Sequence, residues 1–424
     1  MNIIFLLPPL VTFGGVYMLF KSDFFFFLRP IRTLRAFASS FKEKNARRAL
    51  SLALAGTLGI GNIVGVAFGI IAGGAGSVFW LLVSALFAMV LKYSETSLSA
   101  DFKVGGHGGM AIVIKSTFFR FGGCLSGSYA ALCLLLSLIM GAALQSASAA
   151  DCASEAVGMP RSTFGFLFVI LVLFSVLGGA SVIERITVAV IPLAVVIYLF
   201  LTFLVIGENF SRLPDVFSLI LSSAFSAKSV GGGIVGFLAS SSVREGFARG
   251  LLSNEAGAGT SSMAHSRSTL HPAAVGLSGM CEVFLDTVIL CPITALAILL
   301  AVPDLSIYSH GMSLVFDSIG RVLGVWSGYL LLFSILAFAY STVICWYYYG
   351  SECKKFVFSK GVFPFLPIYL FFVYLGTVAS LDFFVTAADI VLFLLTVLSL
   401  SAVIKNSDRI VALSENFGLI SSRF

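Results

Sequence analysis

The sequence contains few charged residues. Lys, Arg, Asp and Glu together make up 11% of its 424 residues, whereas soluble globular proteins contain about 25%. Hydrophobic residues reach 58% of the chain, and the mean hydropathy is +1.04. A water-soluble fold of this length is excluded, because its surface would need far more charge. We predict an all-α integral membrane protein that forms one helical bundle.

The side chains of enzyme and metal centres are also scarce. The chain has four histidines, and its seven cysteines form no Cys-x-x-Cys pair, so neither a metal centre nor a disulfide framework is expected. No nucleophile–His–acid set and no phosphate-binding loop is found, which argues against a membrane-embedded enzyme. His265 and His271 flank Arg267 and are expected to be solvated loop residues. We therefore predict no catalytic residues and infer no obligate protein partner.

Apolar stretches of about 20 residues indicate membrane-spanning helices. The sequence contains about eleven of them, near residues 3–20, 50–72, 76–97, 123–145, 164–181, 186–206, 231–270, 273–302, 320–349, 365–381 and 384–404. The first stretch has no basic segment before it and no clear cleavage site, so we expect a retained helix. A multi-pass protein of the inner (plasma) membrane, with the lipid bilayer as its partner, is predicted.

The positions of Lys and Arg predict the orientation, because cytoplasmic loops carry an excess of both. In the loop between the first two spans, residues 29–48 contain seven basic residues and one acid, Glu43. If this loop is cytoplasmic, nineteen basic residues fall in cytoplasmic segments and four in outer segments. The distribution predicts an N-terminus outside and a C-terminus in the cytoplasm. It also explains the net charge of +6 without a nucleic-acid partner.

Glycine and asparagine interrupt the second span. Gly56, Gly59 and Gly61 lie directly before Asn62. Glycine costs about 1 kcal/mol relative to alanine inside a helix, so this run weakens the backbone at one point. Within a membrane, non-helical backbone is tolerated only where it is buried in protein or lines a wet cavity. The run therefore predicts a broken helix with a binding site at the break, as in secondary transporters.

A second interpretation of the same region is close helix packing. Gly61, Gly65, Gly69 and Gly73 recur every four residues, a spacing that lets two helices touch. The sequence is compatible with helix packing alone and with a break that is followed by helix packing.

A similar interruption is predicted in the second half of the chain. Residues 253–259 contain another Gly-x-Gly pair beside polar side chains, and the next span follows after a similar gap. Residues 231–233, three glycines, are an alternative position for this break. Without the first helix, ten spans remain, and two sets of five that start on opposite sides form an inverted repeat.

The predicted organisation has five parts. They are an extra N-terminal helix with a basic cytoplasmic loop (1–49), a first five-helix repeat (50–206), an extracellular connection (207–230), a second five-helix repeat (231–404) and a cytoplasmic tail (405–424).

The first break offers groups for the carboxylate of a zwitterionic amino acid. The backbone N–H groups of Ile60, Gly61 and Asn62 start the second half of the broken helix, and helix N-termini bind anions. Glycine at positions 59 and 61 lets a ligand approach the backbone closely, so Gly59 joins the predicted site. The small residues around the break leave room for a small side chain only, such as that of alanine or glycine.

The second break offers acceptors for the ammonium group. Carbonyl groups freed between Ser253 and Gly257, near Asn254, would accept it. Glu255 could attract the ammonium or hold the break together by accepting N–H bonds or pairing with Arg249, and we favour the structural role, because a carboxylate at membrane depth is expensive.

Four blocks of the sequence resemble the alanine or glycine:cation symporter family. They are GIGNIVGVAFGIIAGGAGSVFW with Lys92 and Glu95 downstream, RGLLSNEAGAGTSSMAH, FLDTVILCPITALAILL and AFAYSTVICWYYYGSE, within residues 50–350. The family is similar in architecture to the leucine-transporter fold, which has ten helices in two inverted fives with helices 1 and 6 unwound. The sequence departs from the family at Ala75, where proline is usual, and near Val385, where the family has a tryptophan.

The resemblance also implies a sodium site. In the leucine-transporter fold one ion lies between helices 1 and 8. Matched to this sequence, its ligands would be the carbonyls of Ala55, Leu58 and Phe338 and the hydroxyls of Ser341 and Thr342. Back-bonding of both hydroxyls to their own helix is the alternative.

Gln145 completes the predicted substrate site. It lies at the outer end of its helix and faces the same cavity if this fold is adopted, and the family also has a glutamine there. An interhelical hydrogen bond is the alternative role. Lys92 and Glu95, at the base of their helix, are expected to form an inner-gate contact or a surface pair.

Together these expectations predict a sodium-coupled symporter that imports small neutral amino acids by alternating access. Alanine and glycine are the expected substrates, with D-alanine or serine as further candidates. One charge moving inward carries about 2.3 kcal/mol per 100 mV, so sodium can act as the coupling ion. A proton-coupled or exchange carrier, in which Glu255 titrates, is the alternative.

Overall fold

The computed structural model describes residues 6–40, 43–104, 108–225, 240–358 and 364–420. Its helices in chain order are α1 (Leu7–Lys21), α2 (Phe25–Leu28), α3 (Pro30–Ser40), α4 (Lys44–Thr57), α5 (Val64–Gly73), α6 (Gly76–Asp101), α7 (Met110–Thr117), α8 (Gly122–Leu136), α9 (Gln145–Val157), α10 (Arg161–Leu177), α11 (Gly179–Glu208), α12 (Leu213–Ala224), α15 (Ser241–Asn254), α16 (Ser262–His265), α17 (Pro272–Val283), α18 (Cys291–Ala301), α19 (Gly311–Leu323), α20 (Val325–Val357), α21 (Phe365–Val378), α22 (Leu381–Lys405) and α23 (Ser407–Asn416). The 3₁₀ turns are η2 (Ile60–Asn62) and η4 (Phe210–Arg212), and π-helical segments η3 (Ser137–Leu144) and η5 (Phe284–Leu290) join α8 to α9 and α17 to α18.

The helices confirm the prediction of an all-α integral membrane protein. Among the described residues, six helices are long and apolar enough to cross a membrane, and a bent pair adds a possible seventh. The six are Gly76–Asp101, Gly122–Val157, Gly179–Glu208, Pro272–Ala301, Val325–Val357 and Phe383–Lys405. Two shorter apolar helices are Arg161–Leu177 and Phe365–Val378. Each of the eleven predicted stretches overlaps a helix, but a count of eleven crossings stays a prediction.

Both predicted interruptions are present in the backbone. Asn45–Thr57 and Ile60–Gly73 meet at 60°. The second interruption follows α15, where Glu255, Gly257 and Gly259 all have positive φ. Glycine adopts this conformation without a steric penalty, which explains the glycines at positions 257 and 259. We call residues 255–261, between α15 and α16, the linker. The alternative break at 231–233 lies outside the described residues.

The glycine stripe of α5 packs against α15. A Cβ on Gly61 would lie 3.3 Å from the Ser253 Cα, and one on Gly69 would lie 3.2 Å from the Arg249 Cγ. A Cβ on Gly73 would lie 3.0 Å from the Glu245 Cβ, whereas one on Gly65 would have no neighbour within 4 Å. The order of these contacts makes α5 and α15 antiparallel. Break and packing therefore occur together, and Gly65 faces open space.

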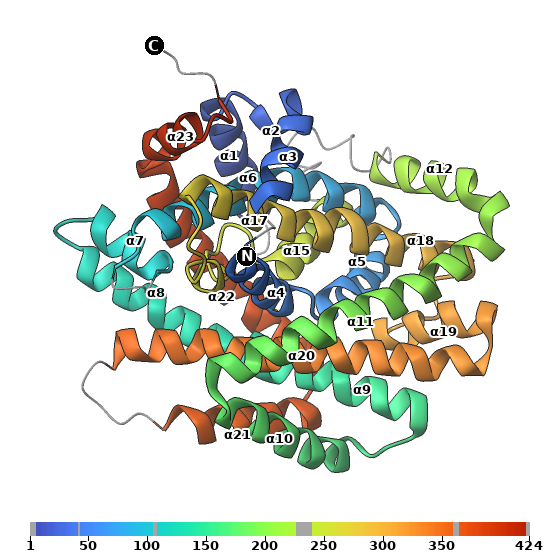
Figure 1. Ribbon diagram of the computed structural model, residues 1–424. Coiled ribbons are helices and arrows are strands. Elements are labelled where there is room, and N and C mark those ends of the chain that lie inside the picture. Colours follow the sequence, from blue (N-terminus) through green and yellow to red (C-terminus); the bar gives the residue numbers. More distant parts are fainter. Residues whose placement is uncertain (1–5, 41–42, 105–107, 226–239, 359–363, 421–424) are drawn as a thin grey trace.

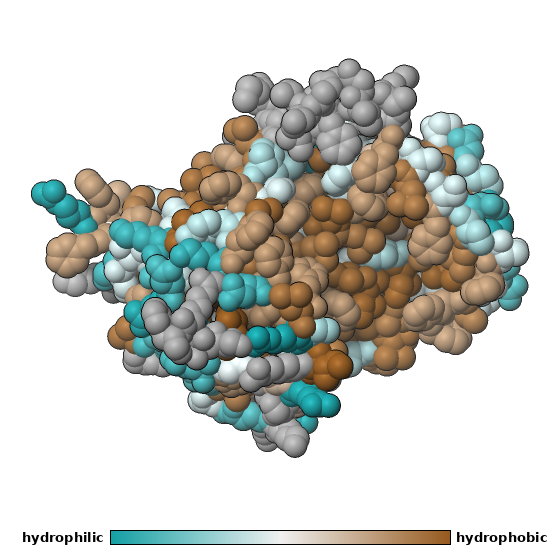
Figure 2. Space-filling model, turned by 90° about the horizontal axis from the view of Figure 1, so that it is seen from above, coloured by the Kyte–Doolittle hydropathy of each residue, from teal (hydrophilic) through white to brown (hydrophobic). Residues whose placement is uncertain are grey.

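Helices α6, α15 and α17 pack together near the middle of the molecule, while α10 and α21 lie side by side at its edge (Figure 1). Helices α10, α11 and α21 expose large apolar side chains, including Phe166, Phe174, Phe200, Phe203 and Phe371. Figure 2 shows hydrophobic side chains over a broad part of one face. An apolar exterior of this kind suits contact with lipid.

Contacts near the helix ends join two separate groups of segments. The first group is held together by four hydrogen bonds and one ion pair. The hydrogen bonds are Arg29 Nη1 to Leu419 O (3.2 Å), Lys103 Nζ to Ser268 O (3.2 Å), Asn406 Nδ2 to Thr117 Oγ1 (2.8 Å), and Thr269 to Glu43. The ion pair joins Arg267 to Glu184 (2.8 Å). The second group is connected by Arg161 Nε to Thr377 O (2.8 Å), Arg212 Nη1 to Leu300 O (2.6 Å), Ser242 Oγ to Gly73 O (2.6 Å) and Trp80 Nε1 to Ala224 O (3.3 Å). The two groups coincide with the two sides that the lysine and arginine count predicts.

Candidate functional site

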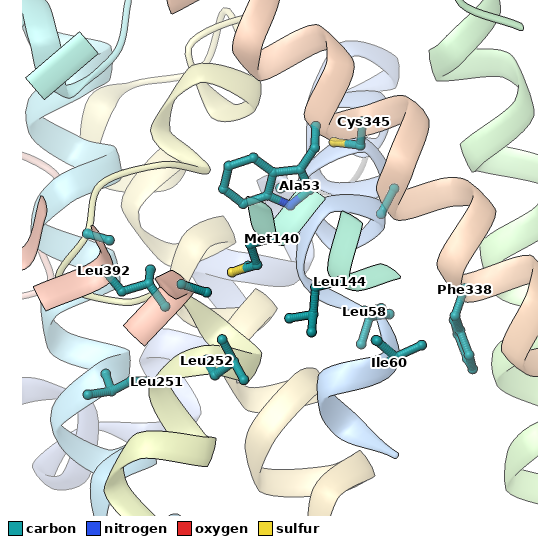
Figure 3. Close-up of a cluster of buried hydrophobic side chains, with 14 of the residues drawn as sticks. Ala53, Leu58, Ile60, Met140, Leu144, Leu251, Leu252, Phe338, Cys345 and Leu392 are labelled. Atoms are coloured by element: carbon teal, nitrogen blue, oxygen red, sulfur yellow. The ribbon is translucent and has the colours of Figure 1, made fainter. Parts of the chain in front are cut away.

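The break between α4 and α5 borders a small cavity. Its other walls come from the α8–η3–α9 span, α15 and α22. The space between the walls is ≈ 460 Å³, of which ≈ 30 Å³ is open to the centre of a water molecule. Figure 3 shows Ile60, Met140, Leu144 and Leu252, from three different segments, gathered around one point. These apolar walls and the small open volume suit a compact ligand.

Three of the predicted substrate residues lie together on this cavity. Ile60, Gly61 and Gln145 all line it, and the Ile60 backbone N–H donates to Gln145 Oε1 at 3.2 Å. Gly59 lies directly beside them, since a Cβ there would be 2.8 Å from Gln145 Oε1 and 3.0 Å from Thr342 Oγ1. An alanine at this position would therefore push on both side chains.

The ends of the two broken helices meet at Gly61. A Cβ on Gly61 would lie 3.7 Å from the Leu252 carbonyl oxygen, near the C-terminal end of α15. The start of α5 is a positive end of a helix dipole, and the end of α15 is a negative end. A ligand that carries a carboxylate and an ammonium group can therefore bind to both ends at once.

Asn62 and Ser253 point away from this cavity into a buried polar cluster. Asn62 Nδ2 donates to Asp286 Oδ1 at 2.6 Å, and Ser253 Oγ donates to Asp286 Oδ2 at 2.6 Å and to Asn62 Oδ1 at 3.1 Å. Thr287 Oγ1 donates to Asp286 Oδ2 at 2.6 Å. No basic partner of Asp286 is found among the described residues. A buried carboxylate with such surroundings can hold a cation, because oxygen atoms are the preferred ligands of hard cations.

Asn254 and Gly257 belong to a different set of contacts. Lys92 Nζ donates to the Asn254 carbonyl at 2.6 Å, and the Asn254 side chain bonds to Ala256 N and Thr287 Oγ1. The carbonyl that the sequence assigned to a substrate ammonium thus accepts from the ammonium of Lys92. Gly257 packs against Thr396, with its Cβ position 3.1 Å from Thr396 Cγ2.

The predicted sodium ligands lie along the contact between α4 and α20. The Gly59 N–H donates to Thr57 O at 2.7 Å, so the Ala55 carbonyl loses its usual helical donor at Gly59. Ser341 Oγ donates to Ala337 O at 2.7 Å, and Thr342 Oγ1 donates to Phe338 O at 2.9 Å. Both hydroxyls therefore make the back-bonds of the alternative interpretation. Leu58 and Phe338, both labelled in Figure 3, line one narrow space with Gly59.

An ion pair crosses the cavity wall between α15 and α22. Arg249, which lines the cavity with Val385, donates to Asp389 Oδ2 at 3.0 Å and lies 3.6 Å from Glu245 Oε2. The pairing of Arg249 with Glu255, one of the roles considered for Glu255, is wrong, because Glu255 accepts instead from Thr260 in the linker.

The structure corrects two further expectations about charged residues. Lys92 and Glu95 are fully buried rather than a surface pair, and Lys92 Nζ lies 3.1 Å from Glu282 Oε1. His265 is 1% exposed, and its Nε2 lies 2.8 Å from Glu282 Oε2, so it is no solvated loop residue. His271 is exposed and accepts from the Ala273 N–H at the start of α17.

Sequence analysis missed Asp286, Glu282 and Asp389. All three are acids inside apolar stretches, where an ionisable residue is by itself a functional signal. Asn62, Lys92 and Arg249, one partner of each acid, lie far away in the chain, so these pairings could not be read from spacing.

Comparison with known proteins gives a consistent picture. A model of the sodium:alanine symporter family matches residues 2–419. The chain is 30% identical over 355 residues to the sodium/alanine symporter AgcS of Methanococcus maripaludis, with 81% of this chain and 77% of that protein covered. It is 37% identical over 273 residues to a sodium/proton-dependent alanine carrier protein of Bacillus sp. PS3, with 63% and 60% covered. It is 30% identical over 416 residues to a probable sodium/glutamine symporter, GlnT, of Bacillus subtilis, with 94% and 84% covered.

Proposed function

Because the chain belongs to the sodium:alanine symporter family, we propose that it imports small neutral amino acids together with sodium. Alanine and glycine are the proposed substrates, with serine and D-alanine as further candidates. The observation that carries this proposal is the cavity at the α4–α5 break, where Ile60, Gly61 and Gln145 meet between apolar walls.

The substrate carboxylate binds at the start of α5, near the backbone of Gly59, Ile60 and Gly61. The substrate ammonium binds toward the carbonyl groups at the end of α15. Gln145 closes the site from the opposite wall and exchanges its bond with Ile60 for one with the substrate. The apolar side chains of Met140, Leu144 and Leu252 leave space for a small substituent on the α-carbon.

Two positions for the coupling ion are proposed. The first is the cluster of Asp286, Asn62 and Ser253, whose buried carboxylate has hydroxyl and amide partners but no basic one among the described residues. The second is the predicted set of Ala55, Leu58, Phe338, Ser341 and Thr342 along α4 and α20. An ion at the first position neutralises Asp286 and holds both broken helices, because Asn62 follows the first break and Ser253 precedes the second.

The proposed topology has eleven crossings, an outer N-terminus and two inverted sets of five. The contacts between helix ends support it, since each joins segments that this topology places on one side of the membrane. The fourth apolar helix of each set is also short, with 17 residues in α10 and 14 in α21. In this arrangement the two broken helices face each other at mid-membrane, which is the geometry of alternating access.

Uptake into proteoliposomes tests the proposal. Purified transporter with an inward sodium gradient should accumulate radiolabelled L-alanine, and unlabelled glycine should compete for it. Accumulation that follows a pH gradient and ignores sodium would favour the proton-coupled alternative. Counterflow without any ion gradient requirement would favour the exchanger, and absence of amino-acid binding would overturn the proposal.

A further inference from the structure

Glu95 is a buried acid with one bare carboxylate oxygen. It lies on α6 opposite the linker and is 1% exposed. Its Oε1 accepts from Ser399 Oγ of α22 at 2.9 Å. Its Oε2 has no hydrogen-bond partner among the described residues. The two carboxylate oxygens therefore have different environments, and a proton on Oε2 removes the cost of an ionised carboxylate with one unsatisfied oxygen.

Among the described residues, the neighbouring cation forms no ion pair with Glu95. The Lys92 ammonium group contacts other residues instead. Its Nζ lies 3.1 Å from Glu282 Oε1 and donates to the Asn254 carbonyl at 2.6 Å. The second oxygen of Glu282 faces His265 at 2.8 Å. An ionised carboxylate that is buried without a paired cation is strongly disfavoured, and a buried acid then keeps its proton.

The groups around Glu95 contain more acid than base. The titratable side chains that face it and its neighbours are Lys92 of α6, Tyr129 of α8, Glu255 of the linker, His265 of α16, Glu282 of α17 and Asp286 of η5, while α22 contributes only the hydroxyls of Thr396 and Ser399. Three glutamates thus share one lysine and one histidine. With Asp286 the group holds four acids against two bases, so even with His265 charged and a cation on Asp286 one negative charge is left, which a proton on Glu95 neutralises.

A water-accessible cavity ends close to this acid. The cavity has ≈ 270 Å³ open to water and is lined by Met110, Tyr129, Met263 and Cys353, among others. The Tyr129 hydroxyl donates to the Ala258 carbonyl of the linker at 2.7 Å, and Met110 packs against Gly259. Tyr129 and the linker therefore separate the cavity from Glu95, so a displacement of the linker would admit water to the carboxyl group.

We propose that Glu95 is a proton-binding site that carries one proton through the transport cycle. With the linker packed against α6, the proton occupies Oε2. When the linker leaves, water enters, and the O–H bond of Glu95 breaks to give a carboxylate and a hydrated proton in the cavity. The proton and the substrate then leave on the same side. This inference rests on the proposed transport function, and it adds a second ion to it.

Calorimetry of L-alanine binding tests this site. The full-length purified transporter is titrated with L-alanine in sodium chloride in two buffers of different ionisation enthalpy, since the difference in heat counts the protons taken up. We expect net uptake of up to one proton per transporter on binding. Glu95→Gln, which keeps the acceptor for Ser399, should bind L-alanine with no buffer dependence. Glu155→Gln, on the exposed end of α9, is the matched control and should behave like the wild type.

The outcomes separate this proposal from the proposed function. If no heat of L-alanine binding is measured in the wild type, the proposed function fails. If L-alanine binds without buffer dependence, or if Glu95→Gln keeps the wild-type dependence, transport stands and the proton site is overturned.

Infrared spectroscopy gives a second measurement that does not need the Gln variant. With saturating L-alanine and sodium, the condition in which the proton is bound, the wild type should show the C=O band of a protonated carboxyl group at neutral pH. Ser399→Ala, which removes one donor from that group, should move the band to higher frequency. A band that stays in place in this variant would assign the proton to another acid.

Discussion

At the scale of single residues, the polar interior is organised around buried carboxylates. Asp286 accepts from Asn62, Ser253 and Thr287, and these donors come from both broken helices and from the π-helical η5 segment. Hydrogen bonds alone leave its charge in a dry interior, which is expensive. In the proposed function a bound cation would remove this cost, and Asp286 would then couple ion binding to the positions of both breaks.

Replacement of Asp286 tests the cation site. Asp286→Asn keeps the size and the acceptor oxygen but removes the charge. We expect the sodium concentration for half-maximal alanine binding to rise by about 10- to 100-fold, while alanine still binds at saturating sodium. The variant Asp304→Asn, in an exposed loop, is the control. An unchanged sodium requirement in the Asp286 variant would place the ion elsewhere.

Gly59 gives a second prediction at this scale. A Cβ there would lie 2.8 Å from Gln145 Oε1, so Gly59→Ala must displace the side chain that accepts from Ile60. Loss of a buried hydrogen bond is worth about 1.5 kcal/mol, or roughly tenfold in affinity. We expect alanine binding to weaken by about this factor. Gly127→Ala, whose Cβ would have no neighbour within 4 Å, should bind alanine normally, and equal affinities for both variants would remove Gly59 from the site.

At the scale of elements, glycine sets the distance between helices. The stripe of α5 lies against α15, and α15 in turn uses Gly246 and Gly250 to lie against α6, where Cβ atoms would be 2.6 Å from Ser77 O and 2.3 Å from Ser84 Oγ. The outer helix α21 approaches η3 in the same way. Three layers of helix therefore pack at backbone contact, which holds the walls of the cavity close together.

The contact between α21 and η3 can be tested by adding one methyl group. A Cβ on Gly376 would lie 2.1 Å from the Ala143 carbonyl oxygen, and neither backbone can move without moving a helix. Gly376→Ala should destabilise the protein by about 1–3 kcal/mol, measured as a lower thermal unfolding midpoint in detergent. Gly127→Ala in α8 is again the matched control. A midpoint equal to that of the wild type would show that α21 is free to shift.

At the scale of the whole molecule, the two ends of the bundle are held by different contacts. Arg161 and Arg212 cap carbonyls of α21 and α18 at one end, and Lys103 and Arg267 bind partners at the other. Basic residues are more numerous at the second end, which the charge rule places in the cytoplasm. The orientation therefore rests on the charge distribution and stays a prediction.

Thiol labelling tests this orientation. Cys124 is exposed at the start of α8, and Ser306 is exposed in the loop between α18 and α19. A membrane-impermeant maleimide should label Ser306→Cys in intact cells, whereas Cys124 should react only in inside-out vesicles. Ser306→Cys in a Cys124→Ser background separates the two signals. Labelling of both cysteines from one side would rule out the eleven-crossing topology.

The sequence by itself determined the class of protein, the apolar stretches and the two breaks. Composition and glycine runs can be read locally, because each glycine lowers the stability of the helix at its own position. The short amphipathic helices α19 and α23 were missed, since their apolar faces are too short for a window of about 20 residues.

Only the tertiary structure decided which polar groups face the cavity. Asn62 looks like a ligand group in the sequence, but Asp286, 224 positions away, turns its side chain into a different cluster. The Asn254 carbonyl likewise accepts a hydrogen bond from Lys92, and the buried His265 contacts Glu282. A buried polar group must find a partner, and in a helical bundle that partner comes from a distant helix. Pairings of this kind depend on how the helices pack, which no local pattern contains.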